Sequence, residues 1–196
     1  QWIATGDARG RVKLWNAKTG QLQFQMNNHS RKITGALFLA DDNRLLTSSA
    51  DNSIAQWDTK TGKEMPQRLL KHTDGVASMA LRPVGRQIIT GSFDGWVRVF
   101  DIDTAAVLGS FKMDSAVNAV AVSPDGQQAI ALNSNDRKIA VWSLNESGDI
   151  KPQRIIDRDA PLWSATFTPD GTGALIVGGS DAMIVDIKSG KTGTSF

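Results

Sequence analysis

The sequence predicts an all-β protein assembled from repeated four-stranded antiparallel sheets. An aromatic residue followed by a polar one recurs every 42 or 43 residues along the chain. Between these pairs lie short apolar runs separated by Gly, Asp and Pro clusters, which are strand and hairpin signals. No stretch keeps the 3.6-residue apolar period that an amphipathic helix requires. A constant interval near 42 residues indicates a repeat architecture rather than one irregular domain.

The repeat is defined by a marker at the same point of each period. His29 and His72 keep the same interval, and each stands 28 residues before its aromatic. The last marker is degenerate because valine replaces the aromatic. The five markers are Trp15-Asn16, Trp57-Asp58, Phe100-Asp101, Trp142-Ser143 and Val185-Asp186.

One period, residues 72–113, predicts four strands in order. The expected strands are residues 76–82, 87–92, 96–102 and 107–112, with a turn at residues 93–95. Turn clusters fall at the same points of other periods, because Pro, Asp, Asn and Gly fit turn geometries. They lie at residues 18–20, 40–43, 60–62, 83–85, 124–126, 147–149, 169–171 and 188–190.

Several of the expected strands are apolar on both faces. Residues 117–122 read Val-Asn-Ala-Val-Ala-Val, and residues 175–177 read Leu-Ile-Val. A strand with one wet face alternates apolar and polar residues, so these strands are expected to be covered on both sides. Small sheets stacked radially on copies of themselves achieve this, which is the architecture of a β-propeller.

These residues resemble the WD40 repeat family, whose signature is a histidine before the first strand and Trp-Asp ending the third. The resemblance implies a WD40-type β-propeller with four-stranded antiparallel blades, open, with four blades and a partial one. The whole chain, residues 1–196, reads as one propeller segment. The partial blade is residues 1–28, and the repeats are residues 29–71, 72–113, 114–156 and 157–196.

The resemblance also implies a structural tetrad of hydrogen-bonded side chains between blades. In one repeat it runs from the Trp57 indole through the Thr47 hydroxyl and the His29 ring to the Asp51 carboxylate. Ser49 has the same strand parity as Thr47 and is an alternative to it. Partial tetrads are expected from His72, Thr90 and Asp94, where Phe100 replaces the indole, and from Asp136 and Trp142, with Asp114 in the histidine position. We interpret both histidines as structural and expect no metal site.

Composition narrows the function classes. The 196 residues are 40% hydrophobic and 21% charged, with a net charge of only +2. A nearly balanced charge gives little electrostatic capture of nucleic acid, and no run approaches a membrane span. Cysteine is absent, so thiolate chemistry and disulfides are excluded. We expect no cofactor, no nucleic acid partner and no membrane partner, and the cytoplasm is the favoured compartment.

Two aromatic residues are candidate partner-binding residues. Trp163 opens a first strand, and Phe93 precedes the turn residue Asp94. By the resemblance both lie near the narrow end of the propeller, where partners dock. The sequence favours burial of each between blades, and exposure in an interaction hot spot is the alternative.

The sequence therefore predicts a scaffold that binds other proteins or peptides and is not an enzyme. The expected innermost strands contain a single ionisable residue, Arg82, which argues against a catalytic channel. The alternatives are an accessory domain of a larger, possibly bacterial, enzyme such as a kinase or protease, or a propeller hydrolase. An open arc would expose apolar faces at both ends. We therefore also expect contact with the rest of its own propeller or self-association through the terminal blades.

Overall fold

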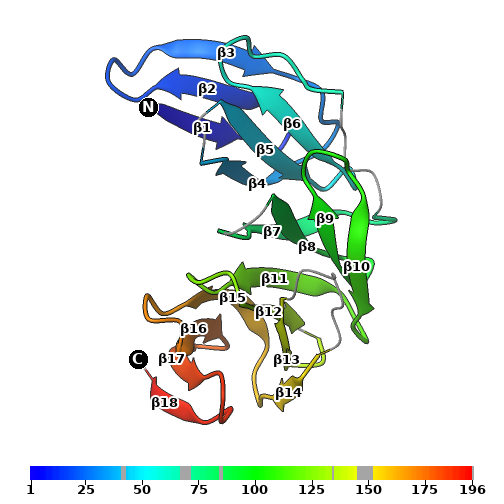
Figure 1. Cartoon of the computed structure of the whole chain (residues 1–196), viewed down its shortest axis with the longest axis vertical. Helices are drawn as coiled ribbons and strands as arrows, with labels where there is room; N and C mark the ends of the chain where they lie inside the picture. Colours follow the sequence, from blue (N-terminus) through cyan, green and yellow to red (C-terminus); the bar gives the residue numbers. More distant parts are fainter. Residues whose placement is uncertain (41–42, 67–71, 84–85, 134, 145–151, 196) are drawn as a thin grey trace. The chain divides into compact units, whose positions relative to one another are not determined.

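A computed structural model of the chain describes residues 1–40, 43–66, 72–83, 86–133, 135–144 and 152–195. Within these residues every regular element is a strand (Figure 1). The predicted all-β class, with four-stranded antiparallel sheets, is confirmed. The predicted turns at residues 40–43, 83–85 and 147–149 include residues outside the described part.

The strands form five antiparallel sheets, which we number blades 1 to 5 in chain order. Their bounds are as follows: blade 1, β1 (Trp2–Gly6), β2 (Val12–Asn16) and β3 (Leu22–Met26); blade 2, β4 (Ile33–Phe38), β5 (Arg44–Ser49) and β6 (Ile54–Asp58); blade 3, β7 (Val76–Leu81), β8 (Gln87–Ser92), β9 (Trp96–Asp101) and β10 (Val107–Lys112); blade 4, β11 (Val117–Val122), β12 (Gln128–Asn133), β13 (Lys138–Ser143) and β14 (Arg154–Asp157); blade 5, β15 (Leu162–Phe167), β16 (Gly173–Gly178), β17 (Asp181–Asp186) and β18 (Thr192–Ser195).

The chain forms two compact units, Gln1–Ala77 and Ser78–Phe196. Blades 1 and 2 belong to the first unit, and blades 4 and 5 belong to the second. Blade 3 belongs to the second unit except for the first two residues of β7.

Neighbouring strands pair in sequence order, so each blade is a meander. In the four-stranded blades the first strand, β7, β11 or β15, lies at one edge of the sheet, in the position that the WD40 resemblance assigns to the inner strand. Blade 1 has three strands, and its β1 corresponds to the second strand of the other blades. In blade 2, Trp57 of β6 also forms an isolated antiparallel bridge to Glu64.

The first strands of blades 2, 4 and 5 share one irregularity. The register shifts between Ile33 and Gly35 in β4, and between Leu162 and Ser164 in β15. The residues skipped by the register are Thr34 and Trp163 respectively, and β11 skips a residue at the same place. An extra residue in a strand bends it and redirects one side chain, so the bulge is a repeated feature of the blade.

The core lies between blades. In the second unit Ile130, Leu132, Ile139 and Val141 of blade 4 pack against Ala174, Ile176, Met183 and Val185 of blade 5. In the first unit Val12, Leu14 and Met26 of blade 1 pack against Leu45, Ala55 and Trp57 of blade 2. A strand with a blade on each side is therefore buried on both faces, and β12 is buried at every residue after its first. By contrast, β16 alternates and exposes Val177.

Candidate functional site: an inter-blade hydrogen-bond chain and an exposed aromatic surface

Four side chains of blade 2 form one continuous chain of hydrogen bonds. The Trp57 indole N–H donates to Thr47 Oγ1 at 2.7 Å, and Thr47 Oγ1 lies 2.8 Å from His29 Nε2. On the other side of the ring, His29 Nδ1 lies 2.9 Å from Asp51 Oδ2. Three of the four residues, Trp57, Thr47 and His29, are almost inaccessible to solvent. Burial leaves these polar groups no water, so the chain satisfies them internally.

The direction of the chain assigns the histidine tautomer. An indole nitrogen can only donate, so Thr47 Oγ1 accepts from Trp57. In a neutral ring whose Nδ1 faces the Asp51 carboxylate, Nε2 is the acceptor, and the Thr47 hydroxyl donates to it. The remaining ring nitrogen, Nδ1, then carries the proton and donates to Asp51. This assignment gives both ring nitrogens a hydrogen-bond partner, so the chain fixes the orientation of the ring.

Asp51 also closes the turn between β5 and β6. Its Oδ1 accepts the Ser53 hydroxyl at 2.6 Å and the Ser53 N–H at 3.1 Å, while Oδ2 accepts the Ser30 N–H at 2.9 Å. Burial by itself raises the pKa of Asp51, but the hydrogen bonds from Ser53, Ser30 and His29 outweigh it and lower the pKa below its ordinary value. The carboxylate is therefore held ionised and fully used, and has no spare capacity for acid–base chemistry.

Blade 4 keeps the tryptophan but loses its acceptor. Trp142 pairs in register with Ala129 as Trp57 pairs with Leu45, so Ala131 occupies the position of Thr47. The Trp142 indole nitrogen is buried and has no hydrogen-bond partner among the described residues.

The other polar residues of that repeat make separate contacts. Asp136 accepts from the Asn133 amide at 2.6 Å, which lowers the pKa of Asp136. Asp114, in the histidine position, pairs with Lys138 at 2.7 Å. Asp114 and Asp136 therefore have partners other than the Trp142 indole. Among the described contacts, no hydrogen-bond chain like that of blade 2 connects the three residues.

The residues of the partial tetrad expected in the third repeat belong to both units. His72 lies in the first unit and is buried, while Thr90 and Asp94 lie in the second. Asp94 Oδ1 accepts the Trp96 N–H at 2.9 Å, and its Oδ2 pairs with Arg98 at 3.1 Å. The two side chains are only 12% and 4% exposed, and Asp94 thus has a charged partner that the sequence did not suggest.

Blade 1 contains a pair that the sequence reasoning missed. The Trp15 indole N–H donates to Thr5 Oγ1 at 2.9 Å, which repeats the Trp57–Thr47 bond. The signal was the ten-residue spacing, which is identical in both pairs. The sequence places Arg9 in the position of Asp51, but Asp7 caps this turn by accepting the Arg9 and Arg11 N–H groups at 2.9 and 3.0 Å.

Phe93 and Trp163 are exposed, so the burial favoured from the sequence is wrong for both. Phe93 is 44% accessible and Trp163 is 55% accessible. Phe93 follows the last residue of β8, and Trp163 occupies the bulge of β15. Large exposed aromatics on rigid strands and tight turns lose little entropy on binding and suit an interaction surface.

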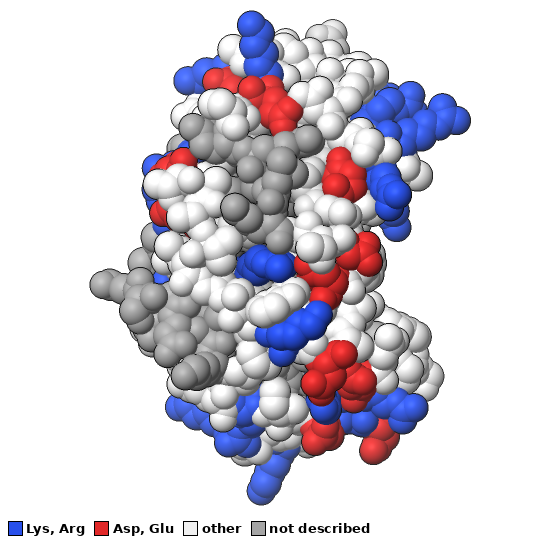
Figure 2. Space-filling view, turned by 90° about the vertical axis from the view of Figure 1, so that its right-hand side faces the viewer, with Lys and Arg blue, Asp and Glu red and all other residues white. Residues whose placement is uncertain are grey.

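The charged residues on the face drawn in Figure 2 are of mixed sign. On the face drawn in Figure 2, Lys and Arg side chains are interspersed with Asp and Glu side chains. Such a pattern is typical of a solvated surface and offers little long-range attraction to a polyanion.

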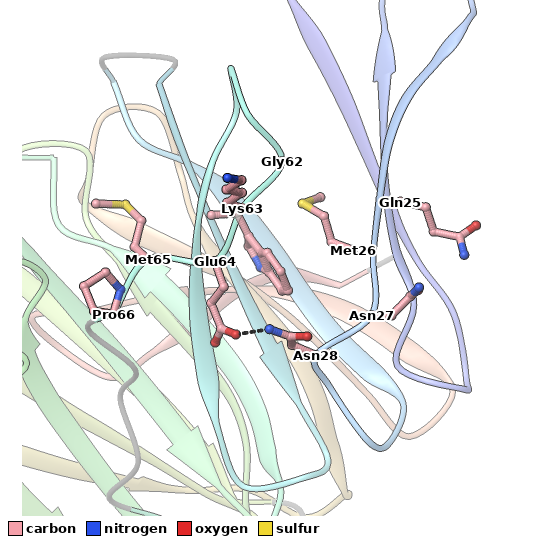
Figure 3. Close-up of a pocket in the computed structure, with 10 residues that line it drawn as sticks. Gln25, Met26, Asn27, Asn28, Gly62, Lys63, Glu64, Met65 and Pro66 are labelled. Atoms are coloured by element: carbon pink, nitrogen blue, oxygen red, sulfur yellow. Dashed lines mark hydrogen bonds between the residues drawn. The ribbon is translucent and has the colours of Figure 1, made fainter.

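A hollow of about 700 Å³ lies within the first unit, between the end of blade 1 and the segment after β6. In Figure 3 the Glu64 and Asn28 side chains point toward one another and share a hydrogen bond. The lining combines two methionines and the Trp57 ring with amide side chains, one lysine and one glutamate. Its residues are Gln25, Met26, Asn27, Asn28, Trp57, Gly62, Lys63, Glu64, Met65 and Pro66. This lining contains no second carboxylate and no histidine, so it lacks an acid–base pair.

Within the described ranges no three His, Cys, Asp or Glu side chains converge as a metal site requires. No helix of the described part is long and apolar enough to span a bilayer.

The chain is similar to one family model and to several curated proteins. A family model described as outer membrane protein assembly factor BamB matches residues 8–194. The chain is 24% identical over 162 residues to the target of rapamycin complex subunit wat1 of Schizosaccharomyces pombe, covering 82% of this chain and 51% of the relative.

It is 26% identical over 189 residues to eukaryotic translation initiation factor 3 subunit I of Drosophila willistoni, covering 91% of this chain and 58% of the relative. Protein ROOT INITIATION DEFECTIVE 3 of Arabidopsis thaliana is 23% identical over 206 residues, covering 97% and 46%. The chain thus spans about half the length of the curated relatives it matches.

The 42-residue period, the meander blades and a family match over nearly the whole chain agree, and the chain belongs to the β-propeller repeat family whose model is described as outer membrane protein assembly factor BamB.

Proposed function

We propose that this chain is a WD40-type scaffold segment that binds other proteins or peptides and performs no chemistry of its own. Two of the similar proteins are named as subunits of multiprotein assemblies, a target of rapamycin complex and a translation initiation factor. The hydrogen-bond chain of Trp57, Thr47, His29 and Asp51 supports the WD40 type within the propeller family.

The inner strands support binding over catalysis. Strands β4, β7, β11 and β15 contain no ionisable residue, and Arg82 follows directly after β7. The Arg82 guanidinium donates to the carbonyl oxygens of Gly126 and Leu144 at 2.8 and 3.0 Å. It therefore joins blade 3 to blade 4, and a cluster of titratable groups, which a catalytic channel needs, is absent from these described strands.

Binding is proposed to use Phe93 and Trp163 as apolar anchors. The observation that carries this proposal is the exposure of these two side chains, at 44% and 55%, because a large aromatic side chain that can enter a partner's pocket is a typical interface anchor. Aromatic anchors of this kind contribute a large share of the binding energy at protein interfaces.

The test is partner capture by the immobilised chain carrying Phe93→Ala, Trp163→Ala or both. Val107→Ala is the matched control, because Val107 is 40% exposed but lies on an outer strand. Partners retained by the wild type and the control are expected to be lost or reduced at least tenfold by the double variant. Unchanged capture by the double variant would refute the choice of anchors.

The accessory-domain alternative and the cytoplasmic compartment stay predictions. Determining the parent reading frame decides the first, and microscopy of the tagged parent protein decides the second.

A further inference from the structure

A second hollow, of about 220 Å³, lies within the second unit between blades 4 and 5. Two of its lining residues are apolar and buried, and the other four carry side-chain N–H donors. The described lining contains no carboxylate. Its residues are Val141 and Ile187, then Gln128, Gln153, Arg154 and Lys188.

The register of blade 4 directs Gln128 and Arg154 toward blade 5. Val141 pairs with Ile130 on one side and with Arg154 on the other, and Gln128 lies two residues before Ile130. Side chains alternate between the faces of a strand, so these residues share the face whose Ile130 and Val141 pack against blade 5.

Blade 5 contributes the second cation from its β17–β18 turn. A Cβ placed on Gly190 would lie 3.4 Å from Arg154 Nη1, so the guanidinium lies against this turn. Lys188 belongs to the same turn and lines the same hollow. Two positive charges from different blades therefore border one cavity.

The equivalent place between blades 1 and 2 is occupied by aromatic side chains. By strand register, Phe24 of β3 is the equivalent of Arg154. Trp2 of β1 is likewise the equivalent of Gln128. Both aromatic residues pack against the core of the first unit, and a Cβ on Gly62 would lie 2.5 Å from the Phe24 ring. Packing alone favours the aromatic pair, so the polar pair in blade 4 has another use.

The two cations have no acidic partner in the described part of the chain. Neither the Arg154 nor the Lys188 side chain forms a hydrogen bond or an ion pair with a described residue. Lys188 makes a small electrostatic contribution to the lowered pKa of Asp186, which is due chiefly to hydrogen bonds from Ser189. Asp186 accepts both the Ser189 hydroxyl and the Ser189 N–H, at 2.7 and 2.6 Å, so this carboxylate is already engaged.

We propose that this hollow binds the phosphate group of a phosphorylated serine or threonine on a partner peptide. A phosphate monoester carries a charge of about −1.5 to −2 at pH 7, which two cations match better than they match one carboxylate. The planar Arg154 fork suits two phosphate oxygens, Lys188 supplies a third donor, and the two amides complete the lining. The inference rests on the proposed function, that the partner is a protein or peptide, but it involves neither Phe93 nor Trp163.

The exposure of the lining sets the expected strength. Gln153, Arg154 and Lys188 are exposed, so salt screens their charges and the affinity should fall as ionic strength rises. A single phosphate group in such a site is expected to bind with a dissociation constant of about 1 mM.

The experiment is a nuclear magnetic resonance titration of the ¹⁵N-labelled 196-residue chain at low salt. The probe is the peptide Ala-Ala-phosphoserine-Ala-Ala with both ends blocked. The backbone signals of Arg154 and Lys188 are expected to shift and to saturate with one dissociation constant. The unphosphorylated peptide should shift neither signal, and a glutamate in place of phosphoserine should bind at least about threefold more weakly.

Two variants and a matched control locate the binding. Arg154→Phe introduces the residue type of the equivalent Phe24 and is expected to abolish binding, with the signals of the first unit unchanged. Lys188→Ala alters an exposed turn and is expected to weaken binding at least about tenfold. Lys60→Ala removes the equivalent lysine of blade 2 and should bind as the wild type does.

Signals of the hollow that do not move with the phosphopeptide would overturn the proposal. Wild-type affinity in both Arg154→Phe and Lys188→Ala would also overturn it. Inorganic phosphate that binds as tightly as the phosphopeptide would assign the hollow to a free ion and refute the peptide. The titration uses neither aromatic anchor, so its failure leaves the capture experiment unaffected, and failed capture by the anchor variants leaves this titration unaffected.

Discussion

Replacing each of two equivalent tryptophans by phenylalanine tests the hydrogen-bond chain directly. Trp57 donates to Thr47, whereas the Trp142 indole is buried without an acceptor among the described residues. Phe100 occupies the same position in blade 3 and is fully buried, so a phenyl ring fits the blade there. The two substitutions remove the same atoms from comparable sites and differ chiefly in the hydrogen bond.

The expected magnitude follows from that difference. Trp57→Phe loses one hydrogen bond worth about 0.5–1.5 kcal/mol, in addition to the packing loss. Trp142→Phe has a comparable packing loss but removes an unpaired buried donor that costs about 1–3 kcal/mol. The free energy of unfolding should therefore fall by about 1.5–4.5 kcal/mol more in Trp57→Phe than in Trp142→Phe.

The assay is urea unfolding followed by far-ultraviolet circular dichroism, because tryptophan fluorescence changes with the substitution itself. A reciprocal control completes a double-mutant cycle. Ala131→Ser offers Trp142 an acceptor, so Trp142→Phe should become more costly in that background. In a Thr47→Ala background, Trp57→Phe should become milder. Equal losses for Trp57→Phe and Trp142→Phe, unchanged in these backgrounds, would refute the reasoning.

Three further predictions concern turns, acid and a cross-blade cation. Ala105 has a φ of 59°, where the equivalent Gly62 has 68°, so Ala105→Gly should raise the free energy of unfolding by about 0.5–1 kcal/mol. Gly62→Ala should lower it, because the new Cβ meets Phe24 at 2.5 Å; the opposite signs would contradict this account. The lowered pKa of Asp51 contributes stability above the unfolded-state value near 3.8, and this stability is lost as pH falls through the folded-state pKa. Acid melts from about pH 5 to about pH 2.5 should therefore be flatter for Asp51→Asn, and an unchanged slope would count against it. Arg82→Lys cannot make the three hydrogen bonds to Gly126, Leu144 and Gln87, and should lower the urea midpoint by an amount equivalent to about 1.5–3 kcal/mol; a wild-type midpoint would rule out this bracing role.

Much of the blade could be predicted from local patterns. The markers around Trp57 and Trp142 indicated the period, and Pro-Asp-Gly clusters indicated the turns. These signals are local because a strand's alternation and a turn's backbone angles depend on a few neighbouring residues. The pairing of Thr47 with Trp57 was predicted only through the resemblance to the WD40 repeat family, since strand parity alone also allowed Ser49.

The site was less predictable because exposure depends on what covers a residue. Phe93 and Trp163 are aromatic, as many core residues are. They are exposed to solvent because Phe93 lies at a turn and Trp163 lies in a bulge. The Arg98–Asp94 pair was hidden for a related reason. Its four-residue separation brings the charges together only once the turn before β9 is formed.

The sequence by itself determined the strand order, the 42-residue blade and the hydrogen-bonding capacity of each blade, because periodic burial and turn chemistry are written into neighbouring residues. The tertiary structure decided which of these donors and acceptors form hydrogen bonds and which apolar side chains are covered. It pairs Trp57 with an acceptor and leaves Trp142 without one in the described residues. It also buries Leu132 of blade 4, whereas Val177, the equivalent residue of blade 5, is 37% exposed. The reason is that burial and partner choice depend on the adjacent sheet, which a single repeat does not contain.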